Sequence, residues 1–362
     1  MIMAGGAGTR LWPVSRAGTP KQLTPFIHRE GGAVTLLDVA AERMDGLVDP
    51  ANRYICTNEQ FRTQIRERLP AFADANILGE PAPRDTVNAV GFAAAVLEKQ
   101  DPDAVFAVLT ADHLITPQDI FAKAMDIGFK LVEEKPHRLI TFGIKPTFPA
   151  TGYGYVEQAG EITSTDGLGF HVARFVEKPE LAKAQQYLAK GTFFWNSGMF
   201  VFSAKTIMAL LEKYMPENYA GLRRVQDAWG THDQQRVLGE VYPKLPKKSV
   251  DYAIMEPASE DDSVTICGVR MDVEWLDVGS WPSYSETIDP DPSNNRAAHG
   301  TRAVMVDCMD TTAISSCPDH TVALLGCEGL IVVHTPDATL VMPADKAQDL
   351  KTLHGKLDEE LK

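Results

Sequence analysis

The chain begins with short apolar runs that alternate with longer amphipathic stretches over about its first 150 residues. The apolar runs predict strands at residues 1–4, 53–57, 105–110 and 139–143. The amphipathic stretches carry apolar residues at helical spacing and predict helices at residues 36–47, 59–69, 86–99 and 118–134. Strands and helices in alternation predict an α/β fold with a mixed, mostly parallel sheet and helices on both faces. Ligands bind to such sheets at the carboxyl ends of the strands.

The α/β pattern continues to about residue 287 and then changes. Its second half predicts strands at residues 153–157, 172–177, 198–202 and 264–269 and helices at residues 180–190 and 205–214. The segment DPDPSNN at 289–295 is rich in turn formers and predicts a linker. Short strands over 304–342 then predict a small β-coil or β-sandwich, closed by a helix over 344–361. We therefore expect an α/β domain over 1–288 and a small β-coil domain with a terminal helix over 296–362.

The composition is typical of a globular protein, with 44% hydrophobic and 23% charged residues in a chain of 362. The net charge of −14 argues against a basic face for nucleic acid or an anionic membrane. Five cysteines without CxxC spacing predict reduced thiols rather than a disulfide framework or a zinc site. The sequence shows neither a long apolar run nor a signal-peptide pattern, so we expect a cytoplasmic location. Because four residues are few for a buried strand, we expect the natural chain to begin before Met1.

The N-terminal region differs from the rest of the chain in charge. Its first 29 residues contain no Asp or Glu but include Arg10, Arg16, Lys21 and Arg29, which favours a small anionic ligand. The segment GGAGTR at 5–10 is rich in glycine, which allows close backbone approach and lets N–H groups face phosphate oxygens. The segment matches neither the dinucleotide fingerprint nor a Walker A loop, and a plain tight turn remains the alternative on spacing alone.

Further motifs make this pattern specific. They are EPAPRDT at 80–86, TADH at 110–113, TGYGYVE at 151–157, FVEKP at 175–179, WNSGMFVF at 195–202, KSVDYAIME at 248–256 and WLDVGSW at 275–281. Together with GGAGTRLWPVSR and PKQ near the start, they resemble the sugar-1-phosphate nucleotidylyltransferase family, and WPVSR is similar to its mannose-1-phosphate guanylyltransferase branch. The resemblance covers nearly the whole chain. It implies a Rossmann-like (GT-A-like) nucleotidyltransferase domain with a C-terminal β-helical cap.

The resemblance implies that GTP and α-D-mannose 1-phosphate give GDP-mannose and pyrophosphate with the help of Mg²⁺. In such a reaction a phosphate oxygen of the sugar phosphate attacks the α-phosphorus of the nucleotide in line. This phosphate is largely dianionic at pH 7, because its second pKa is about 6, and it needs no general base. The protein's task is to hold two anions together and to neutralise the charge that develops on the phosphates.

The resemblance also implies a role for individual residues. The catalytic pair is Arg10, on the leaving pyrophosphate, and Lys21, near the α-phosphate. The expected nucleotide-binding residues are Ala4, Gly5, Gly6, Gly8, Thr9, Arg84, Asp85 and Thr86. The expected sugar-phosphate residues are Gly154, Glu177, Lys178 and Asn196. Asp112 and Asp277 are the expected Mg²⁺ ligands, since each follows a short apolar run and Mg²⁺ prefers oxygen. His113 is expected to form a hydrogen bond or to pack rather than to bind the metal.

Two positions depart from the family pattern. Asp85 stands where relatives usually have Asn, and it either alters the contacts to the base or acts as a helix N-cap. Ala7 stands where the branch commonly has Ser, so a hydroxyl contact to phosphate is missing. Two functional alternatives stay open. One is another pair of sugar 1-phosphate and nucleoside triphosphate, and the other is a non-catalytic sensor of sugar nucleotides, which the intact charged positions disfavour. The β-coil is expected to support a homodimer.

Overall fold

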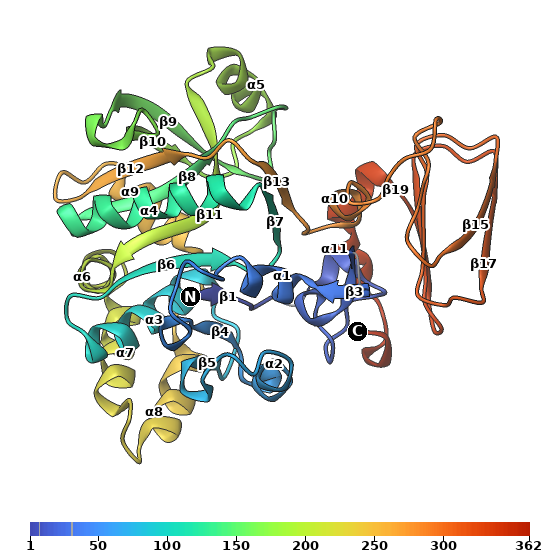
Figure 1. Ribbon diagram of the computed structural model, residues 1–362. Helices are drawn as coiled ribbons and strands as arrows, with labels where there is room; N and C mark the ends of the chain where they lie inside the picture. Colours follow the sequence, from blue (N-terminus) through green and yellow to red (C-terminus); the bar gives the residue numbers. More distant parts are fainter. Residues whose placement is uncertain (7, 30–31) are drawn as a thin grey trace. The chain divides into compact units, whose positions relative to one another are not determined.

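The computed structural model describes residues 1–6, 8–29 and 32–362 (Figure 1). Ala7 lies outside the described residues. The described chain forms two compact units whose segments interleave along the sequence. The first unit comprises residues 1–5, 43–110 and 115–275, and the second comprises residues 6–42, 111–114 and 276–362. The expected division of the chain between residues 288 and 296 stays a prediction.

The first unit is built on a sheet with the strand order β5-β4-β1-β6-β11-β8-β12-β10-β9 in the described part of the chain. The first four strands are parallel: β5 (Ile77–Glu80), β4 (Ile55–Asn58), β1 (Ile2–Met3) and β6 (Val105–Thr110). The other strands are β11 (Phe193–Ser203), β8 (Arg138–Ile144), β12 (Thr265–Arg270), β10 (Gly169–Val176) and β9 (Gly154–Glu161). Only β8 and β12 pair in parallel within this second group. The sheet is mixed, as predicted, with more antiparallel pairing than the N-terminal pattern indicates.

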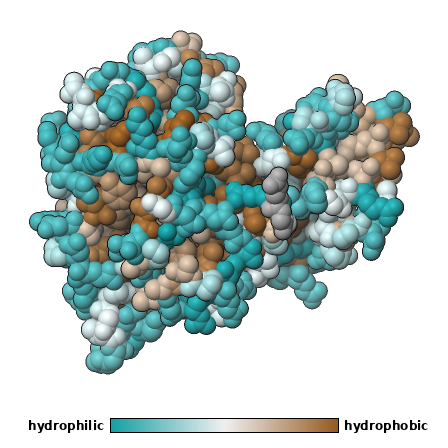
Figure 2. Space-filling view, in the orientation of Figure 1, coloured by the Kyte–Doolittle hydropathy of each residue, from teal (hydrophilic) through white to brown (hydrophobic). Residues whose placement is uncertain are grey.

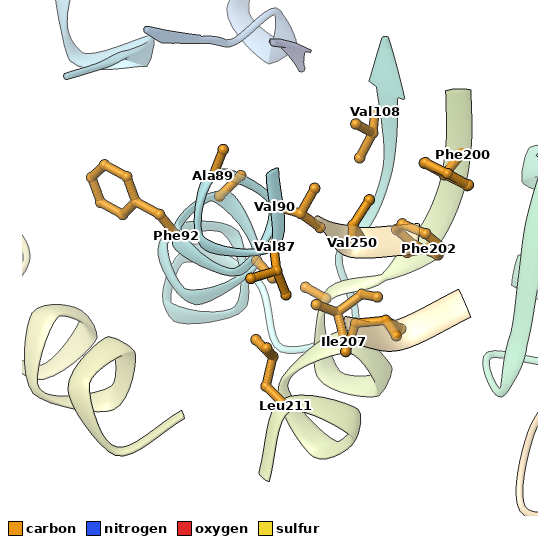
Figure 3. Close-up of a cluster of buried hydrophobic side chains, with 14 of the residues drawn as sticks. Val87, Ala89, Val90, Phe92, Val108, Phe200, Phe202, Ile207, Leu211 and Val250 are labelled. Carbon is orange, nitrogen blue, oxygen red and sulfur yellow. The ribbon is translucent and has the colours of Figure 1, made fainter. Parts of the chain in front are cut away.

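Helices cover the sheet of the first unit. They are α2 (Arg62–Arg68), α3 (Thr86–Gln100), α4 (Gln118–Glu134), α5 (Leu181–Lys190), α6 (Ala204–Tyr214), α7 (Pro216–Ala228), α8 (Gln234–Val241) and α9 (Glu256–Ala258). Figure 3 shows side chains of α3 such as Val87 and Val90 beside Ile207 and Leu211 of α6 in the core. Helix α3 packs closely against α7 at Gly91, where the absence of a side chain is required: a Cβ at Gly91 would lie only 2.6 Å from Leu222 Cδ1. This packing fixes the N-terminus of α3, where candidate nucleotide-binding residues lie.

The structure confirms the predicted strands and helices of the N-terminal half, with differences at their ends. Several elements have no counterpart in the sequence pattern we recognised, namely β5, α7, α8 and a π-helical turn at Asp251–Met255. Strand β5 places Glu80 at its carboxyl end, and the π-helical turn places Asp251 at its start. No helix in the described ranges has both the length and the apolar character needed to cross a lipid bilayer.

The second unit combines N-terminal and C-terminal segments. Its N-terminal part holds β2 (Pro25–Arg29), β3 (Gly32–Thr35) and α1 (Leu36–Glu42). A buried core joins Leu11, Trp12 and Leu36 to residues of the last ninety positions such as Trp281 and Ile331. The indole of Trp12 also donates a hydrogen bond to the carbonyl of Leu361 at 2.7 Å. The segment that contains Leu11 and Trp12 is therefore packed on the C-terminal part of the chain.

The C-terminal part of the second unit is a small parallel β-coil, as predicted. After α10 (Trp281–Ser285), parallel pairing joins β14 (Arg296–Ala297), β16 (Thr312–Ser315) and β18 (Leu330–His334), and separately β15 (Arg302–Val306) and β17 (Thr321–Leu325). Strand β19 (Thr339–Pro343) is antiparallel to β18. The predicted closing helix is broken into a 3₁₀ turn (Ala344–Asp349), α11 (Leu350–His354) and a 3₁₀ turn (Glu359–Leu361). Figure 2 shows apolar residues on the outer face of the coil.

Candidate active site

The glycine-rich loop after β1 requires glycine at Gly8 for steric reasons. The backbone there has φ +60°, and a Cβ would lie 2.4 Å from Ser15 Oγ and 3.1 Å from Lys21 Cβ. Gly8 is also the residue before the 3₁₀ turn Thr9–Leu11. Gly6 has φ +105°, and its Cβ position is open. The loop backbone therefore lies directly against Lys21, as a phosphate-binding loop needs.

Lys21 is a buried, hydrogen-bonded cation in this region. It begins the 3₁₀ turn Lys21–Leu23, and its side chain is 10% exposed. Its ammonium donates to Asp112 Oδ2 at 2.6 Å and to the carbonyl of Val278 at 3.2 Å. Burial alone would raise the pKa of Asp112, but the charges of Lys21 and His113 and the hydrogen bond from Lys21 lower it to about 2. Asp112 is therefore ionised at neutral pH and ready to accept cations.

Asp112 and Asp277 come together, although 165 positions separate them (277 − 112). Asp112 follows β6, and Asp277 ends β13 (Glu274–Asp277). One ligand atom each from Asp112, His113 and Asp277 lie within 4.8 Å of one another. The chain after β13 is fixed by a hydrogen bond from Val278 N to the Asp112 carbonyl at 2.9 Å. Two carboxylates at this spacing fit a Mg²⁺ ion, which also takes phosphate and water oxygens at about 2.1 Å.

His113 and Arg10 have different surroundings. His113 begins β7 (His113–Thr116) and is 5% exposed, with Nε2 3.9 Å from Asp112 Oδ1. Because Mg²⁺ prefers oxygen ligands, the His113 ring is better suited to pack beside Asp112 than to bind the metal. Arg10 lies in the 3₁₀ turn with Thr9, is partly exposed, and donates to Gln348 Oε1 at 3.3 Å. Its guanidinium is accessible to an anion, and its catalytic role stays a prediction.

The N-terminus of α3 carries the three residues expected to bind the nucleotide. Asp85 is the N-cap, has φ 65° and accepts a hydrogen bond from Thr86 N at 2.8 Å, which agrees with the capping alternative. Thr86 Oγ1 accepts a hydrogen bond from Val250 N at 2.9 Å. Arg84 Nε is buried and has no hydrogen-bond partner among the described residues. An unused guanidinium donor beside a helix N-terminus is suited to an anion.

Ala4 and Gly5 lead from β1 toward this region. Ala4 is fully buried, and its N–H donates to the Cys56 carbonyl at 2.8 Å. A Cβ on Gly5 would lie 3.5 Å from Glu80 Oε2. The Ala4 backbone therefore serves the sheet, and Gly5 borders a buried carboxyl group that the sequence analysis did not single out. Glu80 is the first residue of EPAPRDT, and its position at the end of a parallel strand could have identified it.

Glu80 is buried beside Tyr242, whose hydroxyl donates to Oε1 at 2.6 Å. Burial raises the pKa of Glu80 from 4.5 to about 7, although the hydrogen bonds from Tyr242 and Cys56 lower it. A carboxyl group whose pKa is raised on folding stabilises the protein below pH 4.5, and this stability is lost as the pH rises toward 7. The loss amounts to about 3 kcal/mol for such a shift.

We therefore expect Glu80→Gln to flatten the dependence of stability on pH. The free energy of unfolding, measured in urea at pH 5 and pH 8, should fall with pH by about 2–3 kcal/mol less in the variant than in the parent. Glu133→Gln, at an exposed position of α4, is the matched control and should leave the pH dependence unchanged. Equal pH dependence in parent and Glu80→Gln would contradict the assignment.

The residues expected to bind the sugar phosphate form a second cluster, within the first unit. Glu177 is 8% exposed, and Lys178 makes an ion pair with it while its own side chain is 52% exposed. Lys178 has φ 45°, which is unusual outside glycine. A Cβ at Gly154 would lie 2.5 Å from Glu177 Oε2 and 3.3 Å from Asn196 Cβ. Gly154 therefore makes room for the Glu177 carboxylate, rather than only for a ligand.

The predicted residues thus fall into two groups. The second unit brings together Lys21, Asp112 and Asp277, next to the loop at Gly8. The first unit brings together the other cluster of Gly154, Glu177, Lys178 and Asn196, and it also contains Ala4, Gly5 and the α3 N-terminus. The group in the second unit has the residue types that a phosphate and metal site needs. The cluster in the first unit offers a cation beside groups that can bind hydroxyls.

Comparisons with known proteins agree with this chemistry. Residues 1–293 match the nucleotidyl transferase family, and residues 301–357 match the β-helix domain of the mannose-phosphate isomerase and GMP-like type. Mannose-1-phosphate guanylyltransferase of Klebsiella pneumoniae is 36% identical over 354 residues, which cover 97% of this chain and 72% of that protein. The enzyme of the same name from Escherichia coli K12 is 36% identical over 369 residues, covering 100% of this chain and 73% of that protein.

Two solved structures share the fold, one of them over nearly the full length of the chain. A Thermus thermophilus protein described as mannose-1-phosphate geranyltransferase superposes with a TM-score of 0.83 at 30% identity, covering 98% of this chain and 97% of that one. A Helicobacter pylori protein described as mannose-6-phosphate isomerase shares the fold at 24% identity, with a TM-score of 0.59 over 76% of this chain and 98% of that one. These matches confirm the predicted nucleotidyl transferase domain and the β-helix-like C-terminal region.

Proposed function

Because this chain belongs to the nucleotidyl transferase family, and within it to the mannose-1-phosphate guanylyltransferases, we propose that it forms GDP-mannose and pyrophosphate from GTP and α-D-mannose 1-phosphate. The observation that supports this most strongly is the Lys21–Asp112 ion pair with Asp277 in reach, next to the glycine loop. It combines a fixed cation, two carboxylates and backbone approach in one place. This is the equipment that transfer between phosphate groups requires.

The reaction needs positioning rather than proton removal. An oxygen of the sugar phosphate forms a bond to the α-phosphorus, and the bond from the α-phosphorus to the bridging oxygen breaks as pyrophosphate leaves. Lys21 directs N–H bonds at Asp112 and Val278, and a lysine ammonium has a third donor that can hold an α-phosphate oxygen. The glycine-loop N–H groups and Arg10 are the proposed donors that stabilise the charge on the departing pyrophosphate.

Asp112 and Asp277 would hold Mg²⁺. When bound, the ion neutralises charge on the nucleotide phosphates and orients them. Asp112 stays ionised through its contact with Lys21, and Gly279 lies close behind Asp277, since a Cβ there would be 3.0 Å from Asp277 Oδ1. Lys21 thus keeps the Asp112 carboxylate in place, and glycine at position 279 leaves room for the Asp277 carboxylate. The guanidinium of Arg84 and the N-terminus of α3 are the proposed further contacts to the nucleotide.

The proposed activity is tested by assaying pyrophosphate release from four nucleoside triphosphates with mannose, glucose and fucose 1-phosphates. We expect the highest kcat/KM for GTP with mannose 1-phosphate. A preference for another pair would replace these substrates, and binding of GDP-mannose without turnover of any pair would indicate a sensor. Activity with ATP close to that with GTP would show that Asp85 relaxes the choice of base.

Lys178 is proposed to hold the phosphate of the sugar substrate. Its ammonium is exposed while Glu177 anchors it, and charges from Glu177, Asp251 and Tyr252 raise its pKa against the effect of burial. We expect Lys178→Met to raise KM for mannose 1-phosphate roughly 10- to 100-fold, because a charge-assisted hydrogen bond is lost. KM for GTP should stay within about twofold. An equal rise in both KM values would contradict the assignment.

We also propose that the protein is a homodimer and lies in the cytoplasm. Val304, Val306 and Leu325 of the β-coil are 54%, 49% and 75% exposed, and a second copy would cover such apolar residues. Light scattering of the full chain and of Val304→Asp/Leu325→Asp tests this, with the double variant expected to be monomeric. A parent that is itself monomeric would refute the dimer. The free thiols of the described cysteines agree with a reducing compartment.

A further inference from the structure

Asp251 is a partly buried acidic residue that the proposed mechanism does not use. It begins the π-helical turn Asp251–Met255 inside the motif KSVDYAIME. π-Helical turns are rare and occur frequently at functional sites. Asp251 itself is partly exposed, while the last three residues of the turn, Ala253 to Met255, are buried in the core. The turn therefore presents the Asp251 carboxylate from a rigid base.

The contacts of Asp251 lead directly to the sugar-phosphate cluster. Its Oδ1 accepts a hydrogen bond from Asn196 Nδ2 at 2.9 Å. The side-chain oxygen of Asn196, Oδ1, accepts a hydrogen bond from Thr141 Oγ1 at 2.7 Å and another from Gly198 N at 3.1 Å. Because both of these partners donate, the orientation of the Asn196 amide is determined, and its NH₂ group must face Asp251.

The electrostatic surroundings tie Asp251 to Glu177 and Lys178 as well. Burial and the charge of Glu177 raise the pKa of Asp251, while Lys178 and the Asn196 hydrogen bond lower it, and the net result is a pKa of about 7. Asp251 in turn helps to raise the pKa of Lys178. Two carboxyl groups near one ammonium, together with an oriented amide, present both acceptors and donors. This mixture suits the hydroxyl groups of a sugar next to its phosphate.

The position of Asp251 is also fixed from the nucleotide side. Val250 N donates to Thr86 Oγ1 at 2.9 Å, and Val87 N donates to the Lys248 carbonyl at 3.2 Å. The chain just before the π-helical turn is thus bound to the first turn of α3. The location of the Asp251 carboxylate depends on the same helix terminus that carries Arg84, Asp85 and Thr86.

We propose that Asp251 is a further specificity-determining residue, whose carboxyl group binds a ring hydroxyl of the sugar 1-phosphate beside Glu177 and Lys178. This inference rests on the proposed function, since it concerns the sugar site of the same reaction. Its contact with Asn196 sets the carboxyl orientation, and the Glu177 carboxylate offers a second acceptor for the same or a neighbouring hydroxyl. Asp251 discriminates between sugars that differ at that hydroxyl, and not between nucleotides.

The test compares the parent with Asp251→Asn and with Asp262→Asn, an exposed control on the following loop. Steady-state kinetics are measured with mannose 1-phosphate, glucose 1-phosphate and singly deoxygenated mannose 1-phosphates. Asp251→Asn should raise KM for mannose 1-phosphate roughly 10- to 100-fold, the range for one hydrogen bond to a charged group, with KM for GTP unchanged. The preference for mannose over glucose should fall by a similar factor, and Asp262→Asn should match the parent.

The deoxygenated substrates separate binding from a merely structural role. In the parent, removal of the hydroxyl that Asp251 binds should raise KM at least tenfold, and in Asp251→Asn the same removal should have little further effect. A loss of kcat in Asp251→Asn that is equal for all sugars, with KM unchanged, would overturn the proposal. If this variant does not fold, the parent alone decides, because equal KM values for all deoxygenated substrates would also overturn it. A parent that turns over no sugar phosphate would instead refute the proposed function.

Discussion

Replacing Lys21 with Met should lower kcat for GDP-mannose formation by about 10²- to 10³-fold, the cost of removing one preorganised donor to a developing phosphate charge. Lys21 is 10% exposed and held by Asp112 at 2.6 Å and by the Val278 carbonyl at 3.2 Å, so its ammonium is fixed in one position. The measurement is pyrophosphate release at saturating GTP and mannose 1-phosphate.

Two comparisons make the Lys21 result specific. Lys183→Met, on the exposed side of α5, removes an equal charge from the surface and should keep kcat within about twofold. Lys21→Met also leaves Asp112 without its cation, so its pKa should rise from about 2 toward the value that burial favours. The acidic limb of the pH–rate profile should therefore move to higher pH. Retention of parental kcat in Lys21→Met would remove Lys21 from the catalytic assignment.

Asp277→Asn should have the second large effect, on the requirement for the metal. We expect the Mg²⁺ concentration for half-maximal activity to rise at least tenfold and kcat to fall about 10²-fold, because one of two carboxylate ligands is lost. Asp277 is a cleaner target than Asp112, because Asp112 also holds Lys21. Binding of Mn²⁺, followed by electron paramagnetic resonance without substrates, should weaken in parallel.

Asp272→Asn, an exposed carboxylate shortly before β13, is the control for Asp277→Asn and should leave Mn²⁺ binding unchanged. Unaltered Mn²⁺ binding and Mg²⁺ dependence in Asp277→Asn would show that the ion is held elsewhere. The assignment of Asp277 would then fail, while the roles of Lys21 and of the glycine loop would still be tested separately by Lys21→Met.

The sequence predicts those features that depend on local pattern. Strand β6 and helix α4 follow from hydrophobic periodicity, and Asp112 was recognised because it follows an apolar run at a strand end. The resemblance then linked it to Asp277, which no local rule connects with it. The structure adds the physical link, because both carboxylates lie in one cluster with His113.

Other features depend on long-range packing and could not be predicted from local pattern. Glu80 acquires its high pKa from burial in the packed core, and its hydrogen-bond donor is Tyr242, 162 positions away, which the sequence gives no sign of. Asp251 stands in a motif that was recognised but read only as part of the family pattern. Its π-helical turn follows Val250, which is hydrogen-bonded to Thr86, and contains Ala253 to Met255, which are buried in the core. Such contacts arise only when distant segments are packed together.

The interleaving of the two units has a consequence for synthesis of the chain. The apolar side chains of Leu11, Trp12 and Leu36 share a core with residues such as Trp281, Ile331 and Leu350. Ribosomes add about 5–20 residues per second, so the N-terminal segment waits roughly 15–60 seconds for these C-terminal partners. The first unit can close its sheet during that interval, since its residues end at 275. The nascent enzyme should therefore remain inactive, and its N-terminal segment open to chaperones, until the C-terminal residues of this core have been synthesised.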